Sequence, residues 1–296
     1  MGFPITMATR DALQELWRYR YLLRMLVQRE LKIRYKNSMF GILWSAVPLL
    51  LQVMVYTFLF RNVVGVKVEN FSAYLLCGVI PWTFFSTAIL DASQSLLINY
   101  PILRKVYMPR EVIPLANVIS NFIHFMIGWS IYFSVFAVLA RLAGAGIPLL
   151  PTMAWFPIIC FIEALLVTGF SLYAAILNVF YEDVKFLLQT LFQLAFFILP
   201  VLYPADQIYY TSHIIKAHPW LYKVYLLDPI ASVITAFRSA LLQPINPSNY
   251  NKSLTGLHPL PFDWAACIGA TLISIFIAWS GYAYFNSRKW QIVERP

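Results

Sequence analysis

Residues 22–60, LLRMLVQRELKIRYKNSMFGILWSAVPLLLQVMVYTFLF, decide the fold because a basic segment runs directly into a long apolar one. At 100° per residue, a helix over 22–36 collects apolar side chains on one side and mainly basic ones on the other. The apolar side holds Leu22, Leu23, Leu26, Val27 and Ile33, and the opposite side holds Arg24, Gln28, Arg29, Lys32 and Lys36. Glu30 precedes Arg34 by four residues, which favours a helical ion pair. This pattern is typical of a helix on a membrane surface.

The adjoining residues 39–60 carry no charge. At 1.5 Å per residue this run is long enough to cross about 30 Å of hydrocarbon. A solvated helix or a nucleic-acid patch would also explain the basic segment, but the neighbouring span favours the membrane interpretation.

The composition of the whole chain also favours a membrane protein. Hydrophobic residues make up 60% of the sequence and charged residues 12%, with a mean hydropathy of +0.67. A soluble domain of this length is less apolar and more charged, so we expect a polytopic membrane protein. The net charge of +9 is explained by an excess of Lys and Arg on the cytoplasmic side. The three cysteines lack metal-type spacing, so we expect no metal site and no disulfide framework.

Hydropathy predicts an all-α fold with six transmembrane helices. We expect them at about 39–60, 73–97, 112–139, 152–177, 186–203 and 264–285. Residues 1–38 form a cytoplasmic tail with the interfacial helix, 39–286 the transmembrane domain and 287–296 a second cytoplasmic tail. The distribution of Lys and Arg between the connections places both termini in the cytoplasm.

The connection over residues 204–262 differs from the others because it is rich in Pro, Tyr and His. Inside it, the apolar run 230–243 is too short to span a membrane. It therefore predicts a re-entrant or interfacial helix of an extracytoplasmic gate region, with an ordinary extracytoplasmic cap as the equal alternative.

Motifs for catalysis are missing from the sequence. It has no GxxxxGK[ST] phosphate loop, no HExxH, no GxSxG and no CxxC. Intramembrane carboxylates are the default functional candidates, here Asp91 and Glu163. A coupling-ion role competes with hydrogen bonding between helices, for which the candidate partners are Asn117, Asn121, His124, Gln189 and Gln193.

Aromatic residues within the expected spans form another candidate set. Many would face lipid or pack in the core, but a subset could line a path through the membrane. The candidates are Trp44, Tyr56, Phe58, Phe192, Phe196 and Phe197. Flat aromatic faces suit sugar rings because they make no strict hydrogen-bond demands.

Four segments together resemble the permease subunits of ATP-binding-cassette exporters of polysaccharide and teichoic acid. They are RELKIRYKNSMFGILW (29–44), GVIPWTFF (78–85), NYPILRKVYMPREVIPLANV (99–118) and FILPVLYP (197–204). The resemblance implies a homodimer in the bacterial inner membrane with two copies of a separate ATPase, which binds ATP and Mg²⁺. It also implies outward transport of an undecaprenyl-diphosphate-linked glycan, with O antigen preferred and capsule or teichoic acid as alternatives.

The resemblance also implies site residues. The basic cluster Arg29, Lys32, Arg34 and Lys36 would collect the lipid diphosphate headgroup, because guanidinium and ammonium groups bind phosphate well. Anchoring to anionic lipid or contact with the ATPase is the simpler alternative for this cluster. The ATPase would contact loops 99–111 and 178–185 through Arg104, Lys105, Arg110, Glu111, Glu182, Asp183 and Lys185, and gate helices would lie within 207–243.

Two positions depart from the family pattern. Glu182 precedes Asp183 where an Arg-Asp pair is common, and Asp228 precedes Pro229 where Asn-Pro is common. Three other classes also stay open. They are a proton-coupled transporter, a permease for a drug or small lipid, and a membrane-bound glycan enzyme whose only extracytoplasmic candidates are Asp206, Asp228, His213 and His218.

Overall fold

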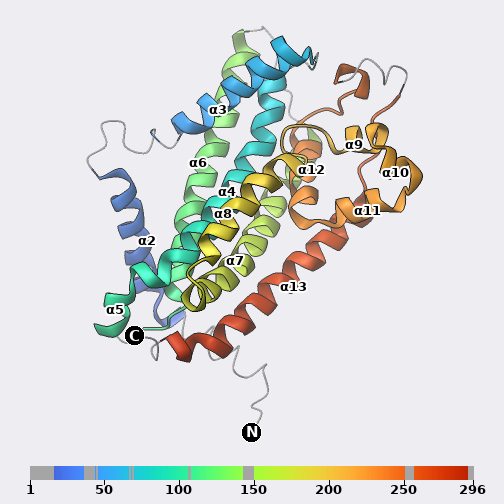
Figure 1. Cartoon of the computed structure of the whole chain (residues 1–296). Helices are drawn as coiled ribbons and strands as arrows, with labels where there is room; N and C mark the ends of the chain where they lie inside the picture. The colour runs from blue at the N-terminus through green and yellow to red at the C-terminus, as the bar shows by residue number, and fades with distance from the viewer. Residues whose placement is uncertain are drawn as a thin grey trace.

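The computed structural model describes residues 17–36, 44, 46–66, 68, 70–105, 108–142, 150–250 and 257–292, and all their regular elements are helical. The long elements are α2 (Arg20–Tyr35), α3 (Ala46–Phe58) with its π-helical continuation η2 (Leu59–Val64), α4 (Phe71–Ile98), α6 (Val112–Leu142), α7 (Phe156–Phe180), α8 (Val184–Ile198) and α13 (Trp264–Arg288). Figure 1 shows them as one elongated bundle, with α5 (Tyr100–Lys105) at the same end as the close of α13.

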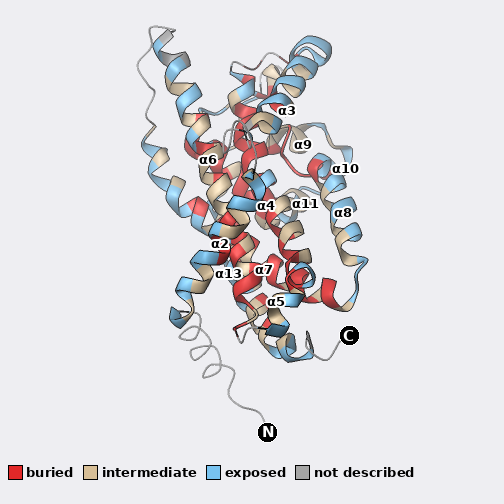
Figure 2. Ribbon diagram, turned by 90° about the vertical axis from the view of Figure 1, so that its left-hand side faces the viewer, coloured by how far each residue is buried: buried red, intermediate tan, exposed pale blue. Residues whose placement is uncertain are grey.

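Helix α4 is the centre of the bundle. It packs against α3, α6, α7, α8 and α12 (Pro229–Leu241). Of its most apolar window 72% is buried, against 6% for the span that contains α3. Buried residues accordingly concentrate on α4 and α7, whereas α8 is largely exposed (Figure 2). Helix α3 therefore leaves most of its apolar surface uncovered within one chain.

Five helices in the described part of the chain are long and apolar enough to cross a membrane: 47–64, 71–98, 112–138, 151–180 and 264–291. The fourth begins with the 3₁₀ turn η3 (Pro151–Trp155). These match five of the six expected spans. Residues 39–43, where the first span was expected to begin, lie outside the described part.

The predicted span over 186–203 is only partly supported. Helix α8 has 15 residues, which corresponds to about 22 Å of rise. It ends at Ile198, and Pro200 then lies in an irregular turn, because proline cannot donate the hydrogen bond that a continued helix needs. A sixth crossing is also available if α11 (Trp220–Leu227) and α12, bent by 88°, are counted as one broken span. The expected number of six spans therefore stays a prediction.

The described part of the predicted gate region holds four short α-helices, α9 (Ala205–Thr211), α10 (His213–Ala217), α11 and α12, and one 3₁₀ turn after them. Asp228 begins α12, since its Oδ1 accepts the N–H groups of Ile230 and Ala231, both at 3.0 Å. Proline at 229 occupies the first helical position, where its missing N–H costs nothing. Helix α12 is largely buried and packs against α4, α7 and α13, and its re-entrant course in the membrane stays a prediction.

The pair α7 and α13 is held at close range by two glycines. A Cβ on Gly169 would lie 2.5 Å from the carbonyl oxygen of Ile277, and one on Gly281 would lie 2.5 Å from that of Gly169. Backbone atoms cannot move aside as a flexible side chain can. The lack of a side chain at Gly169 and Gly281 therefore allows the short distance between these two helices.

Candidate functional site

The residues expected to meet the headgroup and the ATPase gather at one end of the bundle. Helices α4 and α7 end there, α6 and α8 begin there, and α13 runs into η6 (Lys289–Ile292) (Figure 1). Two long-range contacts tie this end together. Arg29 of α2 bonds Asn99 after α4, and Lys289 of η6 approaches Glu111 before α6.

Helix α2 is fixed to α4 and α6 by a polar network. Arg34 donates through Nη2 to Oδ2 of Asp91 at 2.6 Å and through Nη1 to Oδ1 of Asn121 at 3.1 Å. Asn121 donates to the same Asp91 oxygen at 2.9 Å. Asp91 therefore bridges helices, and Asn121 from the predicted partners is confirmed as one of its contacts. Both charged side chains are more than a third exposed, so this ion pair contributes at most about 1 kcal/mol.

A second contact involves Arg29. Its Nη2 donates to Oε1 of Glu30 at 2.6 Å and to Oδ1 of Asn99. The predicted pair between Glu30 and Arg34 is thus wrong, because Glu30 bonds Arg29 while Arg34 reaches across to α4. Helix α2 packs along α6 instead of standing apart from the bundle, and its placement on a membrane surface stays a prediction.

The two lysines of the predicted headgroup cluster differ from the arginines. Lys32 and Lys36 are exposed, and they border an open cavity of about 760 Å³. The cavity is lined by Met25, Gln28, Arg29, Lys32, Ile33, Tyr35 and Lys36. The structure thus brings Arg29, Lys32 and Lys36 to one hollow and directs Arg34 toward Asp91.

Glu163 contrasts with Asp91. Its side chain is fully buried in α7, and neither carboxylate oxygen has a hydrogen-bond partner among the described residues. None of its expected partners reaches it there. Its role as a coupling-ion site or as a helix contact stays a prediction.

The residues expected to contact the ATPase divide by exposure. Arg104, Lys105, Glu182 and Asp183 are exposed, and the guanidinium of Arg104 lies 4.7 Å from the ring centre of Tyr100. Lys185 is partly buried, and its backbone N–H bonds Asn178 Oδ1 at 3.0 Å. These positions suit a docking surface.

Glu111 does not suit that surface. Its side chain is 1% exposed and faces Lys289, with 3.5 Å between Nζ and Oε1. The neighbouring Arg110 lies over the ring of Trp290 at 5.2 Å. The sequence analysis missed this contact because Glu111 and Lys289 are 178 residues apart. Glu111 therefore anchors the end of α13 to the first loop.

Replacing Lys289 by methionine is expected to lower the melting temperature in detergent, because it leaves the carboxylate of Glu111 buried without its cation. The loss should be about 1–3 kcal/mol. Thermal unfolding followed by tryptophan fluorescence would measure it. Arg288→Met is the matched control, since Arg288 is exposed beside it. Adding Glu111→Gln to K289M should restore part of the lost stability, because it removes the unpaired buried charge. If K289M and R288M melt at the same temperature, the contact does not stabilise this end of the bundle.

The six candidate path-lining aromatics separate into two groups. Tyr56 stacks on Phe196 at 5.9 Å, and Phe192 meets the rings of Trp82 and Phe85 at 6.2 and 5.5 Å. These three therefore join α3, α4 and α8 as packing residues. The other three, Trp44, Phe58 and Phe197, are exposed in the single chain. A path along the exposed group stays a prediction.

Arg238, the one charged residue of the apolar run 230–243, is a functional candidate that the sequence did not point to. It is buried in α12, where Nη1 donates to the carbonyls of Pro200 and Tyr203 and Nη2 to that of Val201. Its guanidinium also lies 3.9 Å from the ring centre of Tyr74. A Cβ on Gly78 would come within 2.6 Å of Nη2, so glycine makes room for this side chain. Arg238 thus holds the turn after α8 against α4 and α12.

The residues proposed for a glycan enzyme do not form a reactive cluster in the described part of the chain. Asp228 caps α12, and Asp206 accepts the Tyr222 hydroxyl at 3.2 Å and the Leu260 N–H at 3.0 Å. Burial raises the pKa of Asp206, and these two hydrogen bonds oppose that shift. His213 and His218 lie exposed on and after α10.

Comparison with known proteins defines the class to which this bundle belongs. Residues 21–242 match the ABC-2 type transporter family. Because this range covers most of the chain, the chain belongs to that family, and it is a multi-pass membrane subunit of an ABC transporter.

Its relatives carry a more particular name. A protein of Klebsiella pneumoniae named O-antigen export system permease protein RfbA is 28% identical over 276 residues, which are 92% of this chain and 94% of the relative. A second Klebsiella pneumoniae protein of that name is 30% identical over 224 residues, 75% and 80% of the two chains. One from Myxococcus xanthus is 28% identical over 283 residues, 95% and 97% of the two chains.

Proposed function

We propose that the chain is the membrane subunit of an ATP-driven exporter that carries O antigen across the bacterial inner membrane. The observation that supports this most strongly is the match, over nearly the full length of both chains, to O-antigen export permeases from two organisms. The working unit is a homodimer with two copies of a separate ATPase, and both termini face the cytoplasm.

The free energy for transport comes from ATP hydrolysis by the partner ATPase. The sequence contains no phosphate-binding loop, so ATP and Mg²⁺ bind to the ATPase and the chain itself catalyses no reaction. Arg104, Lys105, Glu182 and Asp183 are exposed where the ATPase would dock. Closure of the ATPase dimer then moves the loops before α6 and α8, and rigid helices pass that movement into the bundle.

The cargo is a polysaccharide on an undecaprenyl-diphosphate carrier. Its diphosphate meets the cavity of Arg29, Lys32 and Lys36, where charge-assisted hydrogen bonds are stronger than neutral ones. Arg34 supports the site indirectly by fixing α2 to Asp91 and Asn121.

A gentle detergent pull-down of the tagged chain from its native membranes tests the class of machine. We expect a stoichiometric ATPase subunit by mass spectrometry and a homodimeric permease by cross-linking. Deleting the gene should leave a lipid-diphosphate-linked polymer on the inner face of the membrane, and lipid extraction with mass spectrometry would identify it. A folded, dimeric chain that binds no ATPase would contradict the proposal.

Changing Lys32 and Lys36 together to glutamine is expected to reduce export of the polymer at least about tenfold, because two charged donors to phosphate are lost. Surface polymer measured by immunoblot reports export, and ATPase pull-down reports assembly. Arg24→Gln is the matched control, because Arg24 is exposed on the same helix outside the cavity. Equal loss in the control, or lost assembly in the double variant, would contradict a headgroup role.

A further inference from the structure

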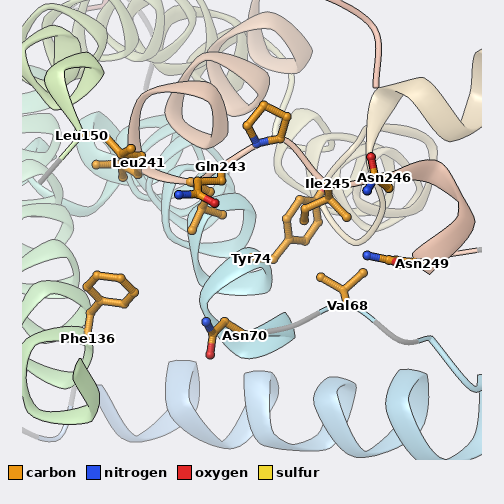
Figure 3. Close-up of a pocket in the computed structure, with 12 residues that line it drawn as sticks. Val68, Asn70, Tyr74, Phe136, Leu150, Leu241, Gln243, Ile245, Asn246 and Asn249 are labelled. Atoms are coloured by element: carbon orange, nitrogen blue, oxygen red, sulfur yellow. The ribbon is translucent and has the colours of Figure 1, made fainter. Parts of the chain in front are cut away.

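Two adjoining cavities lie at the end of the bundle opposite α5, and no step described above uses them. The first, of about 320 Å³, lies between the start of α4, the end of α6 and the segment after α12 (Figure 3). The second, of about 360 Å³, extends toward α9, α11 and the segment before α13. They share Tyr74, Leu242, Gln243, Pro244 and Ile245. They therefore adjoin across a shared wall and make up the two halves of one candidate site.

The first cavity has a particular chemistry. None of its lining residues is charged, and four of them carry side-chain amides: Asn70, Gln243, Asn246 and Asn249. Each amide offers two donors and one acceptor, which matches hydroxyl groups that both donate and accept. Tyr74 and Phe136 add aromatic rings to the wall, as Figure 3 shows. This combination fits a neutral polyhydroxylated ring better than a phosphate-bearing polymer.

The walls of the site are fixed before any ligand arrives. Arg238 lies 3.9 Å from the ring centre of Tyr74 and is itself held by three backbone carbonyls. Asn70 has φ 54°, in the left-handed region that Asn tolerates better than most side chains, and the 3₁₀ turn η4 (Pro247–Asn249) places Asn249. A rigid wall lowers the entropy lost on binding.

The second cavity adds charged groups, the carboxylates of Asp206 and Asp263 and the guanidinium of Arg238. Asp206 lines it with Tyr222 and Phe262, and its two oxygens accept the Tyr222 hydroxyl and the Leu260 N–H. The two carboxylates accept hydrogen bonds from sugar hydroxyls, and they outnumber the single guanidinium, which already donates to backbone carbonyls, so an anionic chain is disfavoured. The combined volume lies within the range of about 300–1,000 Å³ that is usual for small-ligand sites, so it holds one or two sugar units.

We propose that these two cavities bind one or two neutral sugar units of the exported glycan as it leaves the transporter. This inference rests on the proposed export function. The site lies at the end away from the exposed ATPase-docking loops, so the glycan meets it late in transport. Binding there holds the emerged chain against slipping back between cycles of the ATPase.

The test uses the full complex with its ATPase in lipid nanodiscs. The probe is the delipidated neutral glycan of the producing cell, labelled with a fluorophore at its reducing end, and binding is measured by fluorescence polarisation. The Asn246→Ala/Asn249→Ala double variant should bind it about tenfold or more weakly, since two amide hydrogen bonds are removed. Its melting temperature should equal that of the wild type.

Asn62→Ala is the matched control, because Asn62 is an exposed amide on η2 outside both cavities. It should bind the probe as the wild type does. Poly(glycerol phosphate) of similar length should bind the wild type at least about tenfold more weakly than the neutral probe. Unchanged binding by the double variant, or equal binding of the anionic polymer, would overturn the inference.

Failure of the proposed function is distinguishable from failure of this site. If the wild-type complex does not move glycan with ATP, the export function itself fails. If it does, and the double variant binds and exports glycan as the wild type does, only the cavity assignment fails.

Discussion

Replacing Gly169 by alanine is expected to lower the stability of the chain by about 3 kcal/mol or more, because the added methyl group meets backbone. The new Cβ would lie 2.5 Å from the Ile277 carbonyl oxygen and 2.6 Å from its carbon. The helices α7 and α13 would have to separate, and small residues are what lets helices approach closely within membranes. Overpacking usually costs about 1–3 kcal/mol when side chains can adjust, and here the obstacle cannot.

Gly128→Ala is the matched control for this prediction. It also adds one methyl group to a helical glycine, but its nearest neighbours are side-chain atoms of Ile80, at 3.5 and 3.8 Å. That variant should be neutral or up to about 1 kcal/mol more stable, because alanine is the better helix former. Melting temperatures and size-exclusion profiles in detergent would measure both. Similar melting of G169A and G128A would show that α7 and α13 do not depend on this contact.

Arg238→Met is expected to have a comparably large effect. The substitution keeps most of the length and apolar volume of the side chain but leaves the carbonyls of Pro200, Val201 and Tyr203 without their donor. Each unsatisfied buried acceptor costs about 1–3 kcal/mol, so the total loss is several kcal/mol. We expect poor expression and a markedly lower melting temperature.

Two further variants serve as controls for Arg238→Met. Arg238→Lys retains the charge but not the planar fork, so it should recover only part of the stability. Arg141→Met removes an exposed arginine at the end of α6 and should change little. If R238M melts like the wild type, the turn after α8 is held by other contacts.

Hydropathy predicted the long helices well because burial in lipid and burial in protein both require apolar side chains. The spans expected at 73–97, 112–139 and 264–285 correspond to α4, α6 and α13 within three residues at each end. The expected span over 186–203 matched less well. Its apolar run continues through Leu199, Val201 and Leu202, but Pro200 ends the helix, and residues 199–203 turn back to meet Arg238.

Contacts between distant residues were beyond sequence reasoning. Nothing local to Glu111 indicates that it is covered by Lys289, and nothing local to Arg238 indicates that its partners are carbonyls of a turn 35 to 38 residues earlier. The bridge between Asp91 and Asn121 was foreseen because a polar side chain inside an apolar helix must find a polar partner on a neighbour. Its third member, Arg34, was instead assigned to the headgroup.

The weak burial of α3 bears on the order in which the chain is made. Among the membrane-length helices of the described residues, α3 comes first along the chain, and little of it is buried by other helices of the same chain, so lipid can receive it before they are made. Helix α4 follows with Asp91, whose partners include Asn121 of α6, a helix synthesised later. We therefore expect α3 to enter the membrane before the polar contacts at the centre of the bundle form, because those contacts need residues of α6.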